Sequence, residues 1–156
     1  MFSDRVVRVN GSHKLMSKES LKERIKLHEG YRLEPYTDTL GYLTGGVGHR
    51  IMPNEEVPTT KEGWMKLFDS DFQTAWKFME RFCEENNLRV ISDNAKEVLC
   101  EMIYQMGFSG VSKFKNMIKA LQNRDYKLAS IEMLDSRWAK QTPNRAKELS
   151  DHMAKS

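Results

Sequence analysis

The chain has 156 residues, of which 39% are hydrophobic and 30% are charged. This balance is typical of a globular protein and argues against a disordered, collagen-like or fibrous chain. The net charge of +3 favours an anionic partner. Nucleic acid is not the expected partner, because the basic residues are dispersed among acidic ones and no recognised nucleic-acid-binding module occurs.

Residues 1–16 are a predicted appendage to a domain over residues 17–156. Gly11-Ser12-His13 interrupts the pattern, and Met16 is a second candidate start. The segment is either a cloning-derived tag or a short strand that links the domain to a preceding module, and the sequence leaves both open. It lacks the apolar stretch of a secretory signal, and no membrane span is expected in the chain.

The two cysteines, Cys83 and Cys100, fall at apolar positions of helical patterns. We therefore expect free, buried thiols rather than a disulfide. The chain has no cysteine spacing typical of a metal site.

In chain order, the first predicted helix begins at the capping box Ser20-Leu21-Lys22-Glu23 and ends at Gly30, a left-handed C-terminal cap. Glu29 then lies in the last turn, where the helix dipole opposes ionisation and helps to raise the pKa of the carboxyl. Residues 31–51, rich in Gly, Pro, Thr and aromatics, predict a small antiparallel sheet.

A long helix at about 60–82 is predicted to connect two lobes, since apolar residues recur at helical spacing after Thr59-Thr60-Lys61-Glu62. The lobe before it covers about 17–60, and the lobe after it, about 83–156, reads as all helix. Its helical patterns cover 93–106, 112–122 and 125–134, and a last helix begins with Thr142 as N-cap and Pro143 at the first position. The predicted fold class is α+β.

Two carboxylates bracket the glycine-rich hairpin segment. Glu29 ends a helix and Asp38 lies in a turn, a layout suited to acid-assisted cleavage of a glycosidic bond. By themselves they also fit a surface glutamate and an ordinary turn residue. The stretch Gly46-Val47-Gly48 lacks the Lys-Ser/Thr and the helix of a phosphate loop, so close approach of the backbone to the sugar or to Glu29 explains these glycines better.

The segment from Glu29 to Thr44, EGYRLEPYTDTLGYLT, followed by Gly46-Val47-Gly48-His49, resembles the catalytic segment of tailed-phage lysozymes of the T-even type, glycoside hydrolase family 24. A second resemblance to the same family lies in Tyr104-Gln105-Met106-Gly107 and in the run from Ser136 to Lys147, SRWAKQTPNRAK. Together they extend over about Leu21 to Leu149. The resemblance implies a peptidoglycan hydrolase with a small sheet-bearing lobe and a helical lobe, and it implies no metal or cofactor.

The resemblance also assigns roles in catalysis. Glu29 would protonate the leaving group, Asp38 would position or activate the attacking water, and Thr44 would lie by that water, with inversion at the anomeric carbon. His49 would pair with Asp71 and stabilise the fold. Arg145 would approach Glu29 across the cleft and lower its pKa, opposing the effect of the helix end.

Further residues are assigned to the cleft. Tyr104 and Gln105 suit stacking on a saccharide and hydrogen bonding to it, whereas core packing is the better interpretation of Trp138. Met117 and Glu132 fall where members of the family often carry smaller or neutral residues that touch substrate. Other departures are Leu40 at a usually polar turn position and Gly45 in place of a common apolar residue.

The resemblance further implies a monomer that binds bacterial peptidoglycan without stable membrane association. It would wait in the host cytoplasm until a holin opens the membrane, and then act on the cell wall. Three alternatives stay open: a virion-associated wall-piercing domain, a lytic transglycosylase, which the presence of Asp38 and Thr44 disfavours, and an inactive saccharide-binding scaffold.

Overall fold

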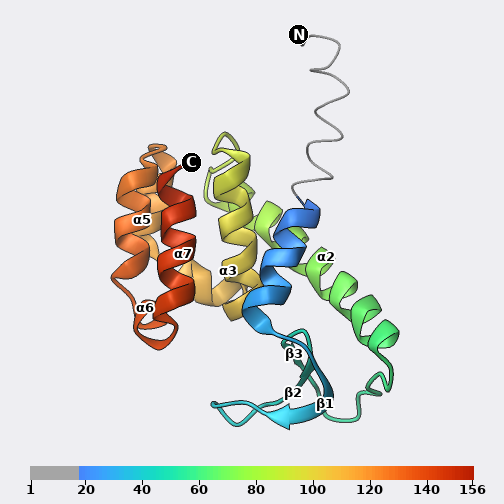
Figure 1. The fold of residues 1–156 in the computed structure, drawn as a ribbon. Helices are drawn as coiled ribbons and strands as arrows, with labels where there is room; N and C mark the ends of the chain where they lie inside the picture. Colours follow the sequence, from blue (N-terminus) through green and yellow to red (C-terminus); the bar gives the residue numbers. More distant parts are fainter. Residues whose placement is uncertain (1–17) are drawn as a thin grey trace, which may run out of the picture. The chain divides into compact units, whose positions relative to one another are not determined.

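The computed structural model describes residues 18–156, which have the predicted α+β fold (Figure 1). The chain divides into two compact units at the boundary between Asp71 and Phe72. The first 17 residues, which include the predicted appendage, lie outside the described residues.

The first unit contains a helix at 18–29, strands β1 (Arg32–Thr37), β2 (Leu43–Gly46) and β3 (His49–Arg50), and the start of helix α2 (Lys61–Glu85). Residues 18–20 are already helical, so Ser20 lies inside the first helix and is not its N-cap, contrary to our prediction. The predicted end is confirmed, because Gly30 has φ +76° and its N–H donates to the Lys26 carbonyl.

The three strands form an antiparallel sheet in the order β1-β2-β3. Thr44 lies opposite Tyr36 on β1 and opposite Arg50 on β3. An irregularity in the register separates Arg32 from Tyr36 on β1. Such irregularities bend a strand and increase its twist, and this one lies next to the turn that carries Asp38.

Trp64 of α2 anchors this sheet. Its indole Nε1 donates to the Leu33 carbonyl (3.0 Å), and its ring lies where a Cβ on Gly45 or Gly46 would be, 2.6 Å from the nearest ring atom at Gly45. Gly46 also has φ +56°, which favours glycine. Gly45, a departure noted above, is therefore explained by the volume of the indole ring.

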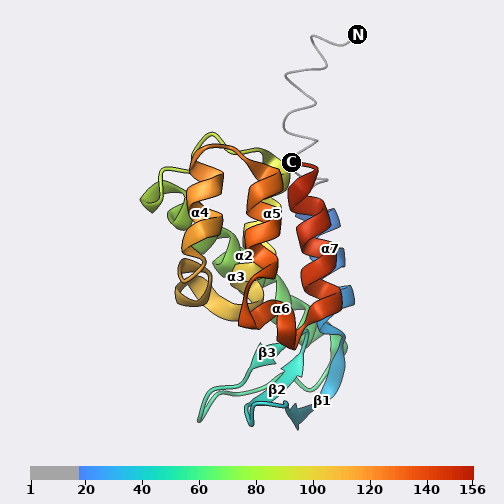
Figure 2. The ribbon, with the colours of Figure 1, turned by 90° about the vertical axis from the view of Figure 1, so that its left-hand side faces the viewer.

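Helix α2 begins as predicted, with the Thr60 hydroxyl accepting from the Gly63 N–H, and continues into the second unit. The other helices of that unit are α3 (Asp93–Ser112), α4 (Lys115–Gln122), α5 (Tyr126–Leu134), α6 (Arg137–Gln141) and α7 (Pro143–Ala154). Within the unit, α7 packs against α3, α5 and α6, and α5 packs against α4 (Figures 1 and 2).

The helical predictions need three corrections. Gly107, with φ +81° and ψ 165°, breaks α3 where a helix end was expected, but the chain then resumes a helical path to Ser112. The short helix α6 was not predicted, because five residues are too few to show a period. Thr142 precedes α7 as expected, yet its hydroxyl donates to the Trp138 carbonyl rather than capping the helix.

The second unit has an apolar core, whose fully buried side chains include Phe82, Leu88, Leu99, Met102, Leu121 and Met133. Cys83 and Cys100 are free and buried, as predicted. Burial raises the pKa of the Cys83 thiol to about 11. Among residues 18–156, none of the helices combines the length and the apolar character that crossing a bilayer requires.

Candidate functional site

Glu29 lies in the last turn of the 18–29 helix, and Gly48 approaches it closely. A Cβ on Gly48 would lie 2.5 Å from Glu29 Oε1 and 2.9 Å from the carboxyl carbon. Gly48 also has φ +65°, so glycine is required both by space and by backbone conformation. The predicted close approach of the glycine segment to Glu29 is confirmed, and it holds the carboxylate against the β2–β3 turn.

Asp38 organises the turn between β1 and β2. Its Oδ1 accepts from the backbone N–H groups of Leu40 (2.9 Å) and Tyr42 (2.8 Å), while its own N–H donates to the Tyr42 carbonyl (2.8 Å). Within residues 18–71, Oδ2 accepts no hydrogen bond. One carboxylate oxygen therefore fixes the turn, and the other is available to a water or a substrate.

Thr44 is 6% exposed, and its hydroxyl donates to the Tyr42 carbonyl (3.0 Å). Because a hydroxyl carries one proton and two lone pairs, Thr44 Oγ1 can still accept a hydrogen bond from a water. Tyr42 thus connects Asp38 to Thr44 through its backbone. The structure thus joins these two residues through the hydrogen bonds of one turn-and-strand segment.

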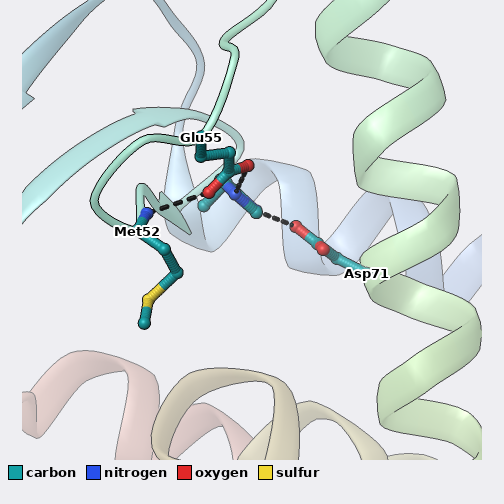
Figure 3. A network of polar contacts seen from close by, with 4 residues as sticks. Met52, Glu55 and Asp71 are labelled. Atoms are coloured by element: carbon teal, nitrogen blue, oxygen red, sulfur yellow. Dashed lines mark hydrogen bonds and ion pairs between the residues drawn. The ribbon is translucent and has the colours of Figure 1, made fainter.

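His49 joins three segments of the first unit. Its Nδ1 lies 2.7 Å from Asp71 Oδ2 on α2, and its Nε2 lies 2.7 Å from Glu55 Oε2 in the following loop. Figure 3 shows Asp71 projecting from α2 and Glu55 reaching in from the loop on the other side. Glu55 Oε1 also accepts from the Met52 N–H (2.9 Å), which fixes the loop. The predicted contact with Asp71 is present, and its stabilising role stays a prediction.

Two carboxylates on one imidazole require both ring nitrogens to donate, so this arrangement is that of a charged histidine. The hydrogen bond to Asp71 is the main cause of a raised pKa for His49, which burial of the ring only partly opposes. The pKa of Glu55 is lowered, first by the Met52 N–H and then by His49. We call His49, Asp71 and Glu55 the histidine clamp.

In the second unit, Arg145 forms a buried ion pair. Its Nε donates to Glu101 Oε2 (3.0 Å), and the Glu101 side chain is fully buried. Its predicted approach to Glu29 involves both units and stays a prediction. Glu101 was not anticipated, although an acid among the apolar residues of α3, between Val98 and Met102, is a signal that a cation lies nearby.

The remaining predicted residues lie on helices of the second unit. Trp138 is 7% exposed and packs edge-on against Phe114, as expected of a core residue. Its Nε1 donates to Gln105 Oε1 (2.8 Å), so one polar group of Gln105 is already engaged. Met117 is 1% exposed, so its position does not support a contact with substrate. Tyr104 and Glu132 are half-buried.

Comparison with known proteins decides the family, because the phage lysozyme family matches residues 26–155, most of the chain. The chain belongs to the phage lysozyme family. Probable T4-type lysozyme 2 of Dictyostelium discoideum is 31% identical over 154 aligned positions, which include 83% of this chain and 91% of that protein.

Two phage relatives of this lysozyme-family chain are much longer proteins. The pre-baseplate central spike protein Gp5 of Enterobacteria phage T4 is 28% identical, with 83% of this chain matched to 27% of Gp5. The peptidoglycan hydrolase gp36 of Pseudomonas phage phiKMV is 28% identical, with 95% of this chain matched to 17% of gp36. In these proteins the matched region is one part of a larger chain.

Glu55 is the other polar residue of this lysozyme-family chain that sequence reasoning missed. It follows the Pro53-Asn54 turn in a loop, where no period shows which way a side chain points. The signal was His49 itself, since a half-buried imidazole with one carboxylate partner has a second nitrogen to satisfy. Within residues 18–156, His, Cys, Asp and Glu form no group of three able to hold a metal ion.

Proposed function

We propose that this lysozyme-family protein is a peptidoglycan hydrolase, a muramidase of glycoside hydrolase family 24 chemistry. Its substrate would be the β-1,4 bond between N-acetylmuramic acid and N-acetylglucosamine. The observation that carries the proposal is the contact of Gly48 with Glu29, in a chain whose family match includes both residues. Because Gly48 has no Cβ, the backbone of the β2–β3 turn can lie against the Glu29 carboxyl group and position it, as general acid catalysis requires.

In the proposed reaction, Glu29 donates its proton to the glycosidic oxygen as the bond to the anomeric carbon breaks. Glu29 ends its helix, and the β2–β3 turn lies against its carboxyl group, which holds the acid in place for this step. Asp38 and Thr44 would hold and activate a water on the opposite face of the sugar. Attack by that water gives inversion and leaves the proton on Asp38.

The hydrogen bonds of the turn support this division of roles. Asp38 Oδ1 is engaged by two backbone N–H groups, which fix the orientation of the carboxylate and leave Oδ2 for the water. The Thr44 hydroxyl donates a hydrogen bond to the Tyr42 carbonyl, so its lone pairs are left to accept one from the water. Neither role needs a metal or a cofactor.

For the biological role, we propose lysis of the infected bacterium by a monomer that waits in the host cytoplasm and reaches the wall after a holin opens the membrane. The second candidate is a wall-piercing domain of a virion protein. It is favoured by the match to the spike protein Gp5, where the same region is one part of a longer chain. Mass spectrometry of purified virions separates the two, since only a virion domain co-purifies with the particle.

The first experiment measures the clearance of outer-membrane-stripped Gram-negative peptidoglycan by the wild type and by Glu29→Gln, with mass spectrometry of the products. Glutamine keeps the shape of the side chain but cannot supply the proton, and general acid catalysis contributes about 10²- to 10⁴-fold. We expect reducing muramic ends from the wild type and a loss of this order in the variant. The anomer formed first, observed by proton NMR, tests inversion.

Other outcomes select the rivals. Anhydro ends in place of reducing ends would identify a transglycosylase. No release by a wild type that still binds the wall would identify a saccharide-binding scaffold. A Glu29→Gln variant as active as the wild type, with the same unfolding midpoint, would remove Glu29 from the mechanism.

A further inference from the structure

Arg50 and Tyr42 form an exposed cation–aromatic pair on the hairpin. The guanidinium carbon of Arg50 lies 3.5 Å from the centroid of the Tyr42 ring. Arg50 is exposed, and Tyr42 is 45% exposed, so a ligand can reach both side chains. Among the described residues 18–156, Arg50 forms no ion pair. The ring thus orients a cation that has no carboxylate partner in this part of the chain.

The backbone places this pair beside the proposed catalytic residues. Arg50 lies directly opposite Thr44 across the β2–β3 ladder, so the two side chains share one face of the sheet. Tyr42 is bound by its carbonyl to the Thr44 hydroxyl and by its N–H to Asp38 Oδ1. A group that binds Arg50 would therefore lie next to the site where Asp38 and Thr44 act.

We propose that Arg50, oriented by Tyr42, binds a carboxylate of the substrate and contributes to specificity for acidic over neutral glycans. The planar fork of a guanidinium matches the two oxygens of a carboxylate, and stacking on a ring reduces the freedom that binding must remove. In intact peptidoglycan the lactyl carboxyl of muramic acid is held in an amide bond to the stem peptide, so the free carboxylates that this substrate offers are those of the stem peptide. This inference rests on the proposed function and names a further binding residue for it.

The sheet contains a matched control. On β1, the other edge strand, the guanidinium carbon of Arg32 lies 4.4 Å from the centroid of the Tyr36 ring. The residue opposite Arg32 on β2 is Gly46 rather than Thr44. Arg32→Gln therefore removes the same charge and the same kind of ring contact from the same small sheet. A general effect of positive charge on wall binding would appear equally in both variants.

The experiment compares the wild type, Arg50→Gln, Arg50→Lys and Arg32→Gln on intact peptidoglycan and on peptidoglycan whose carboxyl groups have been converted to amides by carbodiimide coupling. We expect Arg50→Gln to lower kcat/KM roughly fivefold to tenfold on the intact substrate, mainly through KM, as for loss of a partly exposed charged hydrogen bond. The kcat/KM of Arg50→Lys should lie between those of Arg50→Gln and the wild type, and that of Arg32→Gln should equal the wild-type value. On the amidated substrate the difference between Arg50→Gln and the wild type should vanish.

A third substrate identifies the source of the carboxylate. An amidase removes the stem peptide with its carboxylates from the glycan strands and leaves a new lactyl carboxylate on muramic acid, because it breaks the amide bond between the two. If the difference between Arg50→Gln and the wild type vanishes on these strands, Arg50 binds a stem-peptide carboxylate, and if it persists, Arg50 also accepts the lactyl carboxylate that the amidase has released. Either result supports a carboxylate site.

The same variants in a Glu29→Gln background, measured by equilibrium binding to insoluble sacculi, separate this inference from the proposed function. Failure of hydrolysis by the wild type would overturn the function, whereas binding that still depends on Arg50 and on substrate carboxylates would preserve the site. The carboxylate site would be overturned by equal losses of binding in Arg50→Gln and Arg32→Gln. It would also be overturned if the difference between Arg50→Gln and the wild type persisted on the amidated wall. Unchanged unfolding midpoints establish that the variants are folded.

Discussion

In the first unit, the segment that carries Glu29, Asp38 and Thr44 is shaped by turns and polar contacts, whereas the second unit is shaped by apolar packing between helices. Four glycines of the first segment have positive φ, namely Gly30, Gly41, Gly46 and Gly48. In the second unit the buried residues are mostly apolar, and the Glu101–Arg145 pair is an exception.

This difference between the two units indicates where a substitution can change activity and stability separately. Glycine turns and Asx hydrogen bonds hold side chains in fixed positions while burying little surface, so changes there should move activity more than stability. Buried helical residues contribute through desolvation and packing, so changes there should reduce the folded fraction and leave the proposed site as it is. Four substitutions test this division, from the largest expected effect to the smallest.

The largest effect is expected from Glu101→Leu in the second unit. It leaves the guanidinium of Arg145 without its buried carboxylate, and removing one partner of a buried ion pair costs about 3–5 kcal/mol. Urea unfolding should show this loss, and Glu101→Gln, which keeps an oxygen for the Arg145 Nε–H, should lose less. A variant with wild-type stability would show that water reaches this pair.

Gly48→Ala should reduce both activity and stability. The left-handed conformation costs a residue with a Cβ about 1–2 kcal/mol, and the new Cβ also collides with Glu29 Oε1. We expect at least a tenfold loss of wall clearance, measured by turbidity.

Gly107→Ala is the control for backbone strain, because its φ of +81° and ψ of 165° also disfavour a side chain but a Cβ there meets nothing within 4 Å. It should lose at least as much free energy of unfolding as Gly48→Ala loses from backbone strain, and it should retain its activity. Equal loss of activity in both variants would show that backbone strain, and not displacement of Glu29, is the cause.

His49→Asn should destabilise the protein in a pH-dependent way, by about 1–2 kcal/mol where the histidine clamp is fully charged. The pKa of His49 is raised above its ordinary 6.5, so its contribution is complete below pH 6.5 and is lost as pH rises through the folded pKa. The pKa of Glu55 is lowered from 4.5, so its contribution is present above pH 4.5 and is lost as pH falls through the folded pKa. The thermal midpoint difference should peak between these limits.

The two arms of the histidine clamp should differ. Asp71→Asn should cost more than Glu55→Gln, because the hydrogen bond to Asp71 is the main cause of the raised His49 pKa. A midpoint difference for His49→Asn that stays constant from pH 5 to pH 9 would mean that packing against Trp64, 6.3 Å away between ring centroids, and not charge, is the role of the ring.

The smallest effect is expected from Lys147→Ala on α7. Its Nζ lies 2.9 Å from Asp151 Oδ1 one turn later, but both side chains are more than half exposed. Such pairs contribute about 0.3–0.5 kcal/mol. A calorimetric midpoint shift larger than that of His49→Asn would contradict the division between buried and exposed contacts.

Regular elements of this fold could be predicted where a period or a local cap signals them. The end of the first helix at Gly30, the start of α2 at Thr60 and the helical second unit follow from spacing and capping chemistry. The continuation of α3 past Gly107 and the short helix α6 could not be predicted, because too few residues carry the pattern.

The sequence by itself determined the α+β class, the free buried cysteines, the Glu29–Asp38–Thr44 segment as the candidate site and its resemblance to phage lysozymes. These properties depend on neighbours along the chain, or on residue order within one motif. Only the tertiary structure decided which distant side chains meet: Glu55 on His49, Glu101 on Arg145, Trp64 over the glycines of β2, and Arg50 over Tyr42. Residues in loops, and residues that face each other across strands, follow no periodic pattern in the sequence. Their partners are therefore set only by tertiary packing.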